Sequence, residues 1–338
     1  MPASDPPLKF GSFSIASCRP FAGVVLGDER VLAVEALRAA CRRLDLPLSP
    51  GDTLFDLLQD WDRNLASVRA ALAQGVDEAL CAPLEGLRRH APVAAPRQVI
   101  CTGANYRKHV IDLMVAQGGG AATEGMGVEE RRRQAEVMMD ERAAHGRPYA
   151  WVKTATAVAG PEDDLVLPAH VKEPDWELEL AVVIGKGGRH IPRTDAFAHV
   201  AGYMVANDVT ARDWVFRHDM KVLGTDWITG KGAPGFLPTG PFLVPRDAVR
   251  DPADLRITLK LNGEVMQDES TSDMIFDISR QIEYISQYMQ LLPGDVICTG
   301  SPAGNGAHHN RYLRDGDLIT GEITGLGMQR QRCVLERV

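Results

Sequence analysis

The sequence predicts an α+β fold, mainly β, with a small N-terminal domain at 1–95 and a larger domain at 96–338. Apolar stretches of strand length are separated by short turns of glycine, proline and aspartate more often than by helices, which favours a mainly β core. The alanine- and proline-rich segment 91–96 is typical of a connector between two units. A chain of 338 residues is long enough for one small and one large domain.

The elements are expected in the following order. In the N-terminal domain, strands are expected at 8–17, 21–26 and 30–34, with a turn at Gly27 and Asp28, before helical structure across 52–92. The larger domain begins at Val99, and apolar stretches predict its strands at 164–167, 177–184, 202–206, 242–245, 256–261, 295–299 and 318–323. Helices are expected at 105–116, 129–144 and 273–291.

The overall charge and the apolar content narrow the class of protein. A formal net charge of -8 argues against a nucleic-acid partner, which would require a basic face. The sequence has no run of about 18 apolar residues and no basic N-terminal segment followed by an apolar one, so we expect a cytoplasmic protein without a membrane partner. The six cysteines form no CxxC pair, which indicates mostly buried thiols rather than a zinc site or a disulfide scaffold.

Two glutamates interrupt an otherwise apolar strand. Glu177 and Glu179 are two residues apart in WELELAVVIG, so their side chains project from the same face. Burying adjacent carboxylates requires a compensating cation, and a hard divalent ion such as Mg²⁺ prefers oxygen ligands. Asp208 follows the expected strand 202–206 and supplies a third carboxylate. The spacing alone also fits a strand with one polar face in water, with Asp208 as a helix N-cap and Arg212 as an ion-pair partner of a glutamate.

The region from about 99 to 338 resembles the fumarylacetoacetate hydrolase family. It contains, in the order typical of that family, the motifs GANYRKHV, VKTATAVAGP, WELELAVVIG, AGYMVANDVTARD, LNGEVMQDEST, LLPGDVICTGSPAG and LRDGDLITGEITGLG. The resemblance implies that Glu177, Glu179 and Asp208 bind Mg²⁺, with Mn²⁺ or Ca²⁺ as alternatives. It also implies a mixed β-roll or sandwich around the metal, and a homodimer.

A histidine and an aspartate three residues apart form the candidate catalytic pair. His109 and Asp112 share a face if 105–116 is a helix, and a carboxylate bonded to one ring nitrogen makes the other nitrogen a better base. The residues alone favour a surface histidine paired with an aspartate. The resemblance instead implies a dyad that activates water, although many relatives have glutamate at the second position.

Further residues are expected to contact the substrate. Lys231 resembles the family lysine that faces the substrate oxyanion, although an exposed loop lysine fits the sequence equally well. Thr299 and Gly300 follow an expected strand, and their hydroxyl and N–H groups could hold a carboxylate, the alternative being a plain β-turn. The other expected substrate contacts are Tyr106, Arg212 and Val215, the last at a position where small acylpyruvate-cleaving relatives often have glutamine.

The resemblance implies metal-dependent hydrolysis of a carbon–carbon bond in a small anionic 2,4-dioxo acid, such as an acylpyruvate or a fumarylacetoacetate-like β-diketone, in aromatic-compound catabolism. His109 with Asp112 would activate water, Lys231 would stabilise the oxyanion, and the metal would neutralise the enolate. The alternatives are an oxo-acid decarboxylase, hydratase or isomerase of the same family, and a non-catalytic binding protein. An insertion at about 114–147, with a charged run typical of a solvated helix face, is expected to form a lid or pocket wall.

Overall fold

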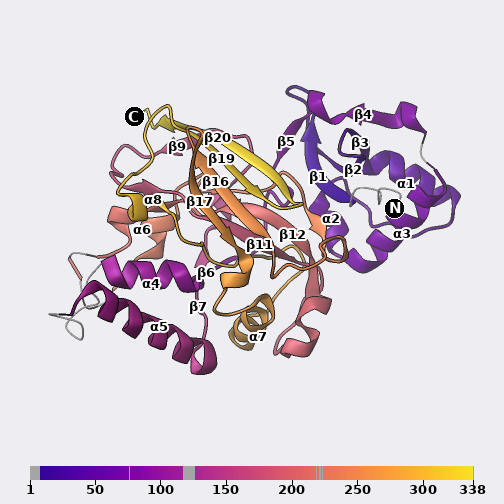
Figure 1. Ribbon diagram of the computed structural model, residues 1–338. Helices are drawn as coiled ribbons and strands as arrows, with labels where there is room; N and C mark the ends of the chain where they lie inside the picture. Colours follow the sequence, from indigo (N-terminus) through magenta and orange to yellow (C-terminus); the bar gives the residue numbers. More distant parts are fainter. Residues whose placement is uncertain are drawn as a thin grey trace, which may run out of the picture.

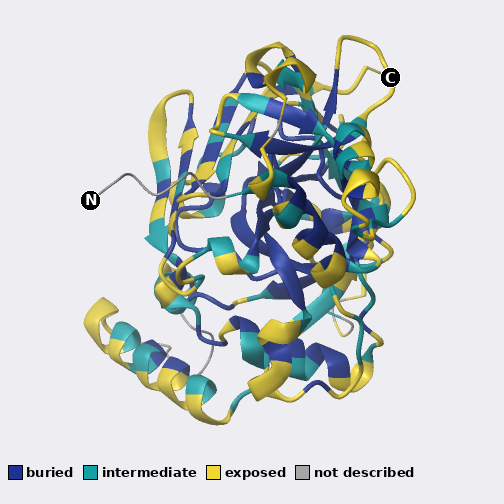
Figure 2. Ribbon diagram, turned by 90° about the vertical axis from the view of Figure 1, so that its right-hand side faces the viewer, coloured by how far each residue is buried: buried dark blue, intermediate teal, exposed yellow. Residues whose placement is uncertain are grey.

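The computed structural model describes residues 8–75, 77–116, 126–217, 219–220, 222 and 224–337. Figure 1 shows the N-terminal part of the chain, in indigo, beside a larger body built on two β-sheets. Buried residues fill the strands at the centre of the molecule, and most exposed residues lie on the outer helices and loops (Figure 2). This arrangement confirms the α+β, mainly β class that the sequence predicts.

The N-terminal residues form a five-stranded sheet in the order β4-β3-β2-β1-β5. Its strands are β1 (Lys9–Ser14), β2 (Phe21–Leu26), β3 (Arg30–Ala33), β4 (Cys81–Pro83) and β5 (Arg88–His90). The predicted turn joins β2 to β3, and Gly27 and Asp28 both adopt the left-handed backbone that such a turn requires, with φ of 62° and 60°. The helices packed against this sheet are α1 (Val34–Arg43), α2 (Leu54–Leu58) and α3 (Trp61–Ala73).

Two expectations for this region are wrong. The α-helical structure expected across 52–92 ends at Ala73, and the described residues in the rest of this range contain only the single-turn 3-10 helices Glu78–Leu80 and Leu84–Gly86 and the strands β4 and β5, which pair with β3 and β1. The helix α1, with its buried residues Leu37 and Cys41, begins where only a strand end was expected. Phe10 and Leu243 exchange two backbone hydrogen bonds, of 2.9 and 2.8 Å, that tie this sheet to the larger body. The division into domains at 1–95 and 96–338 therefore stays a prediction.

A mixed six-stranded sheet forms the centre of the larger body, in the order β15-β12-β11-β18-β6-β7. Its strands are β6 (Val99–Gly103), β7 (Tyr149–Lys153), β11 (Leu178–Ile184), β12 (Val200–Asn207), β15 (Val244–Pro245) and β18 (Val296–Cys298). β6 and β18 run parallel, and the other neighbours are antiparallel. Every residue of β11 and β12 is buried, so polar groups at the ends of these strands lie away from bulk water.

A second sheet has the order β17-β16-β19-β20-β9. Its strands are β9 (Leu165–Leu167), β16 (Arg256–Leu261), β17 (Glu264–Ser270), β19 (Leu318–Ile323) and β20 (Gly327–Leu335). A Cβ added at Gly321 of β19 would lie 2.6 Å from Leu178 Cδ1, so this sheet lies directly against β11. All the strands expected in the larger domain are present, whereas β6 and β7 of the central sheet, β17 and β20 of this one, and the short strands that follow were not among the predicted strands. The short pairs are β8 (Val158–Ala159) with β14 (Leu237–Pro238), and β10 (Pro174–Asp175) with β13 (Thr210–Ala211).

The expected helices 105–116, 129–144 and 273–291 are present with small changes in their bounds. They are α4 (Arg107–Ala116), α5 (Val128–His145) and α7 (Ile278–Tyr288), and the short helices α6 (Trp227–Lys231) and α8 (Gly306–His309) lie near α4 at one end of the molecule (Figure 1). α4 and α5 contain most of a small apolar cluster: Ile111, Ala135, Met139, Ile275 and Phe276. Part of the expected insertion, 117–125, lies outside the described residues. Within the described ranges, no helix is long and apolar enough to cross a membrane.

Candidate metal centre

Three carboxylates meet at one end of the central sheet. Glu177 directly precedes β11 and Glu179 lies within it, whereas Asp208 directly follows β12, the antiparallel neighbour of β11. One carboxylate oxygen from each of the three lies within 4.8 Å of the others, and all three residues are buried. The structure thus brings together the carboxylates that the sequence singles out.

Two buried lysines bond directly to this cluster. The Lys231 ammonium donates to Glu177 Oε2 at 2.9 Å and also to the Asp208 carboxylate. The Lys153 ammonium donates to Asp208 Oδ1 at 2.7 Å. Asp208 therefore lies between two ammonium groups, and Lys231 bridges two of the three carboxylates.

Arg212 brings a third positive charge and a fourth carboxylate. Its guanidinium donates to Glu177 and, at 2.8 Å, to Oδ2 of the buried Asp175. The ion pair that the sequence left open as an alternative for Arg212 is therefore present, and its contact with substrate stays a prediction. Lys153 and Asp175 were not predicted as site residues. The sequence shows only that Asp175 lies two residues before Glu177 and that Lys153 lies within the VKTATAVAGP motif.

Glu179 differs from the other carboxylates in its partners. It accepts a hydrogen bond from the Gly300 N–H at 2.9 Å, and no lysine, arginine or histidine of the described residues donates to it. Burial raises the pKa of Glu179 well above its ordinary value, and the charges of Asp208 and Glu177 raise it further. A hard divalent ion would remove this cost, because carboxylate oxygens are the ligands that Mg²⁺, Mn²⁺ and Ca²⁺ prefer. The residues present therefore fit such an ion.

His109 lies in α4, close enough to Glu177 to be affected by its charge. Burial lowers the pKa of His109 to about 4, so the imidazole is neutral at pH 7 and can accept a proton. Its Nδ1 has no hydrogen-bond partner in the described part of the chain. Asp112 does not bond to it: Asp112 Oδ1 accepts from Arg132 at 2.9 Å, and Oδ2 lies 3.9 Å from His308 Nε2. A role for the dyad in catalysis stays a prediction.

The turn after β18 supports the carboxylate cluster. The Thr299 hydroxyl and N–H donate to the Leu180 carbonyl, at 2.8 and 3.1 Å, and the Gly300 N–H donates to Glu179. The donors that the sequence assigns to a substrate carboxylate therefore hold β11 and Glu179 in position, and contact of Thr299 or Gly300 with a substrate stays a prediction.

Tyr106 and Val215, the other expected substrate contacts, are both buried. The Tyr106 hydroxyl has no partner among the described residues, and burial, followed by the charge of Glu179, raises its pKa well above the ordinary value. Val215 packs beneath α6, where a Cβ added at Gly230 would lie 2.9 Å from Val215 Cγ2. Contact of either residue with a substrate stays a prediction.

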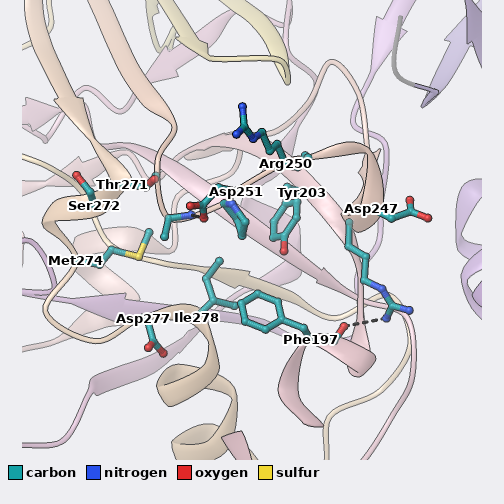
Figure 3. Close-up of a pocket in the computed structure, with 14 residues that line it drawn as sticks. Phe197, Tyr203, Asp247, Arg250, Asp251, Thr271, Ser272, Met274, Asp277 and Ile278 are labelled. Atoms are coloured by element: carbon teal, nitrogen blue, oxygen red, sulfur yellow. Dashed lines mark hydrogen bonds between the residues drawn. The ribbon is translucent and has the colours of Figure 1, made fainter. Parts of the chain in front are cut away.

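A cavity of about 640 Å³ lies outside this cluster. Its walls include Phe197, Tyr203, Met274 and Ile278, and the Tyr203 hydroxyl points toward the space between Phe197 and Ile278 (Figure 3). None of the carboxylates or basic residues described above lines it. The cavity is therefore separate from the candidate metal centre.

Comparison with known proteins shows the family to which the chain belongs. The family model described as fumarylacetoacetate (FAA) hydrolase C-terminal matches residues 98–334. The chain belongs to the fumarylacetoacetate hydrolase family. The protein is therefore an enzyme of the fumarylacetoacetate hydrolase superfamily. The carboxylate cluster is its candidate metal site.

Relatives within the fumarylacetoacetate hydrolase family have several activities. A mitochondrial oxaloacetate tautomerase from Bos taurus is 38% identical over 278 residues, which cover 82% of this chain and 78% of the relative. A 2,4-didehydro-3-deoxy-L-rhamnonate hydrolase from Sphingomonas sp. (strain SKA58) is 36% identical over 266 residues, which cover 78% of this chain and 82% of the relative. The structure of maleylpyruvate hydrolase from Sphingobium sp. SYK-6, in complex with manganese(II) and pyruvate, has a TM-score of 0.70 and 28% identity, and the match covers 97% of this chain and 100% of that one.

Proposed function

We propose that the protein is a divalent-metal-dependent enzyme that interconverts the keto and enol forms of a small 2-oxo acid. The observation that carries this proposal is a neutral, buried imidazole, His109, beside the carboxylate cluster. Keto–enol interconversion moves one proton between carbon 3 and the 2-oxo oxygen, so it requires a base and a cation but no positioned water. Similarity to an oxaloacetate tautomerase supports the same reaction.

Glu177, Glu179 and Asp208 would hold the ion, which we propose to be Mg²⁺, with Mn²⁺ or Ca²⁺ as alternatives. When bound, the ion would polarise the 2-oxo group and stabilise the negative charge that develops on its oxygen. The buried charges favour an anionic substrate once a divalent ion is present. Four carboxylates and three basic groups leave one negative charge, and two positive charges convert this to a net +1: Asp175, Glu177, Glu179 and Asp208 against Lys153, Arg212 and Lys231.

His109 would take the proton from carbon 3 and return it to the substrate. Burial lowers the pKa of His109, so the imidazole starts in the neutral form that can accept the proton. Lys231 would orient the carboxylates, since its ammonium bonds to both Glu177 and Asp208. Its Nζ lies 5.3 Å from the centre of the Trp151 ring, which further restricts the direction of the ammonium group.

The second candidate is hydrolysis of a carbon–carbon bond in a 2,4-dioxo acid, with His109 and Asp112 activating water. Asp112 lies three residues after His109 in the same helix, so a rotated carboxylate could reach the unpartnered Nδ1 and increase the basicity of the ring. Similarity to two hydrolases supports this candidate. Decarboxylation and hydration of an oxo acid are related alternatives, because they also place negative charge on the 2-oxo oxygen.

Assays on the metal-loaded protein separate these reactions. A tautomerase accelerates the change in enol absorbance when freshly dissolved oxaloacetate equilibrates, and we expect this activity and its loss in His109→Gln. A carbon–carbon hydrolase instead releases pyruvate from acylpyruvates of graded chain length, which lactate dehydrogenase detects. Pyruvate released from oxaloacetate itself would identify a decarboxylase. A protein that catalyses none of these reactions would overturn the proposal.

We also propose that the substrate is a small anionic oxo acid and that the protein is a homodimer, which light scattering in solution would test. A cytoplasmic location and a role in aromatic-compound catabolism stay predictions of the sequence.

A further inference from the structure

Three helices bring charged side chains together around His109. Asp112 lies one turn further along α4, and its two carboxylate oxygens face different partners. Oδ1 accepts from Arg132 of α5 at 2.9 Å, and Oδ2 lies 3.9 Å from Nε2 of His308 in α8. None of these three side chains bonds directly to the carboxylate cluster in the described part of the chain.

The position of His308 is linked to the carboxylate cluster through the backbone of α8. The N–H groups of Gly306 and Ala307 donate to the two oxygens of Asp175, which also accepts from Arg212. Arg212 in turn donates to Glu177. The N-terminal end of α8, directly before His308, is therefore held in a defined position relative to Glu177.

Exposure increases from the carboxylate cluster toward this group of side chains. The Lys231 side chain is 2% exposed, whereas those of Asp112, His308 and Arg132 are 14%, 33% and 41% exposed. His109 is in the same helix as Asp112 and is close enough to Glu177 for that charge to act on its ring, so it is near both groups. Arg132 and His308 are therefore the more exposed basic side chains of the group around His109.

We propose that Arg132 and His308 form a subsite for a second carboxylate, so that the substrate is a dicarboxylic 2-oxo acid; this inference rests on the proposed function. A guanidinium presents paired N–H donors that match a carboxylate, and an incoming carboxylate would replace Asp112 as the partner of Arg132. Asp112 would then be free to turn toward Nδ1 of His109, three residues earlier in the same helix. Binding of the second carboxylate and orientation of the base would thus occur together.

The test compares two substrates that differ only at the distal end: oxaloacetate and its C4 methyl ester. For each metal-loaded variant, the measured quantity is kcat/KM for the diacid divided by kcat/KM for the ester. We expect Arg132→Gln to lower this ratio about tenfold, the effect of one lost charge-assisted hydrogen bond. His308→Asn should lower it in the same direction.

Arg133→Gln is the matched control. Arg133 follows Arg132 in α5, is 71% exposed, and bonds to Glu130 at 2.6 Å, so its replacement should leave the ratio unchanged. An unchanged ratio in Arg132→Gln, or equal losses for diacid and ester, would refute the subsite while the tautomerase proposal stands. A wild-type protein that acts on neither compound would instead refute the proposed function.

Discussion

Replacing Glu179 with glutamine should stabilise the protein in the absence of metal and remove the stabilisation that a metal provides. The Glu179 carboxylate is buried beside Asp208 and Glu177, and the lysines that bond to those carboxylates do not bond to it. A glutamine side chain has nearly the same shape, and its carbonyl oxygen can still accept from the Gly300 N–H. The substitution therefore removes a charge and retains the hydrogen bond.

The size of the effect has an upper bound. At pH 7 a buried carboxyl group can always become protonated, and for an ordinary pKa of about 4.3 this limits its cost to about 3.7 kcal/mol. We expect Glu179→Gln to recover about 1–3 kcal/mol of this cost, which is a rise of several degrees in Tm. A metal at 100 times its Kd stabilises the wild type by about 2.7 kcal/mol, and the variant should gain little from it.

Thermal unfolding with EDTA and then with Mg²⁺ measures both effects. Glu177→Gln is the matched comparison from the same cluster. Burial raises the pKa of Glu177, but Lys231 and Arg212 outweigh this and bring the pKa to about 2. Removing that charge leaves the buried Lys231 and the partly exposed Arg212 each short of one partner, so Glu177→Gln should lower Tm in EDTA. If the two variants shift Tm in EDTA by the same amount and in the same direction, the charge assignment in the cluster is wrong.

The other predictions concern pH, packing and metal removal. The pKa of His109 falls from 6.5 to about 4 on folding, so the folded protein binds fewer protons than the unfolded chain in that interval. The titration of His109 should therefore leave the free energy of unfolding unchanged above pH 6.5 and lower it by about 3 kcal/mol as the pH decreases to 4. Urea unfolding should show a weaker decline with pH in His109→Gln than in the wild type. Gly202→Ala would place a Cβ 2.1 Å from the Val244 carbonyl oxygen and should cost about 1–3 kcal/mol, whereas Gly86→Ala, with no atom within 4 Å, should leave the urea midpoint nearly unchanged. Exhaustive chelation should abolish turnover, and Mg²⁺ or Mn²⁺ should restore it; activity that persists would exclude a metal role for the cluster.

The parts of the fold that could be predicted are those whose sequence pattern is local. Apart from Glu179, β11 is an apolar run, and the predicted turn between β2 and β3 contains the residues that tolerate a left-handed backbone. β17 contains many polar residues and is a strand because it pairs with β16 along its whole length. β4 and β5 are each three residues long and likewise depend on partners that are distant in the sequence. Their pairing could not be recognised from a single segment.

In the candidate site too, local spacing could be predicted from the sequence, whereas contacts between distant segments could not. The spacing of Glu177 and Glu179 places both on one face of a strand, and this can be read directly from the sequence. Lys153 lies 55 residues from Asp208, and its role becomes visible only when β7 and β12 are placed in one sheet. Asp112 was expected to bond to His109, yet Arg132, 20 residues away in the insertion, provides its partner. A spacing of three residues shows that a contact can form, but a stronger donor from another helix decides which contact does form.

The cluster contains four carboxylates and three basic side chains, so it carries one more negative charge than positive charges. This excess affects how strongly the cluster binds a metal ion and which substrate charge it can accept. With three basic groups and three carboxylates, the cluster would be neutral and would bind a divalent ion weakly. The fourth carboxylate, Glu179, has no basic partner among the described residues, so it adds one negative charge next to Glu177 and Asp208. A divalent ion then exceeds this charge by one, which matches one carboxylate of the substrate. A second substrate carboxylate could bind Lys153, Arg212 or Lys231 only by displacing Glu177 or Asp208, the candidate metal ligands to which they bond, whereas the acid paired with Arg132, Asp112, is not one of these ligands. The second carboxylate requires a cation on the outer side of His109, and Arg132 is the guanidinium that the structure places next to Asp112.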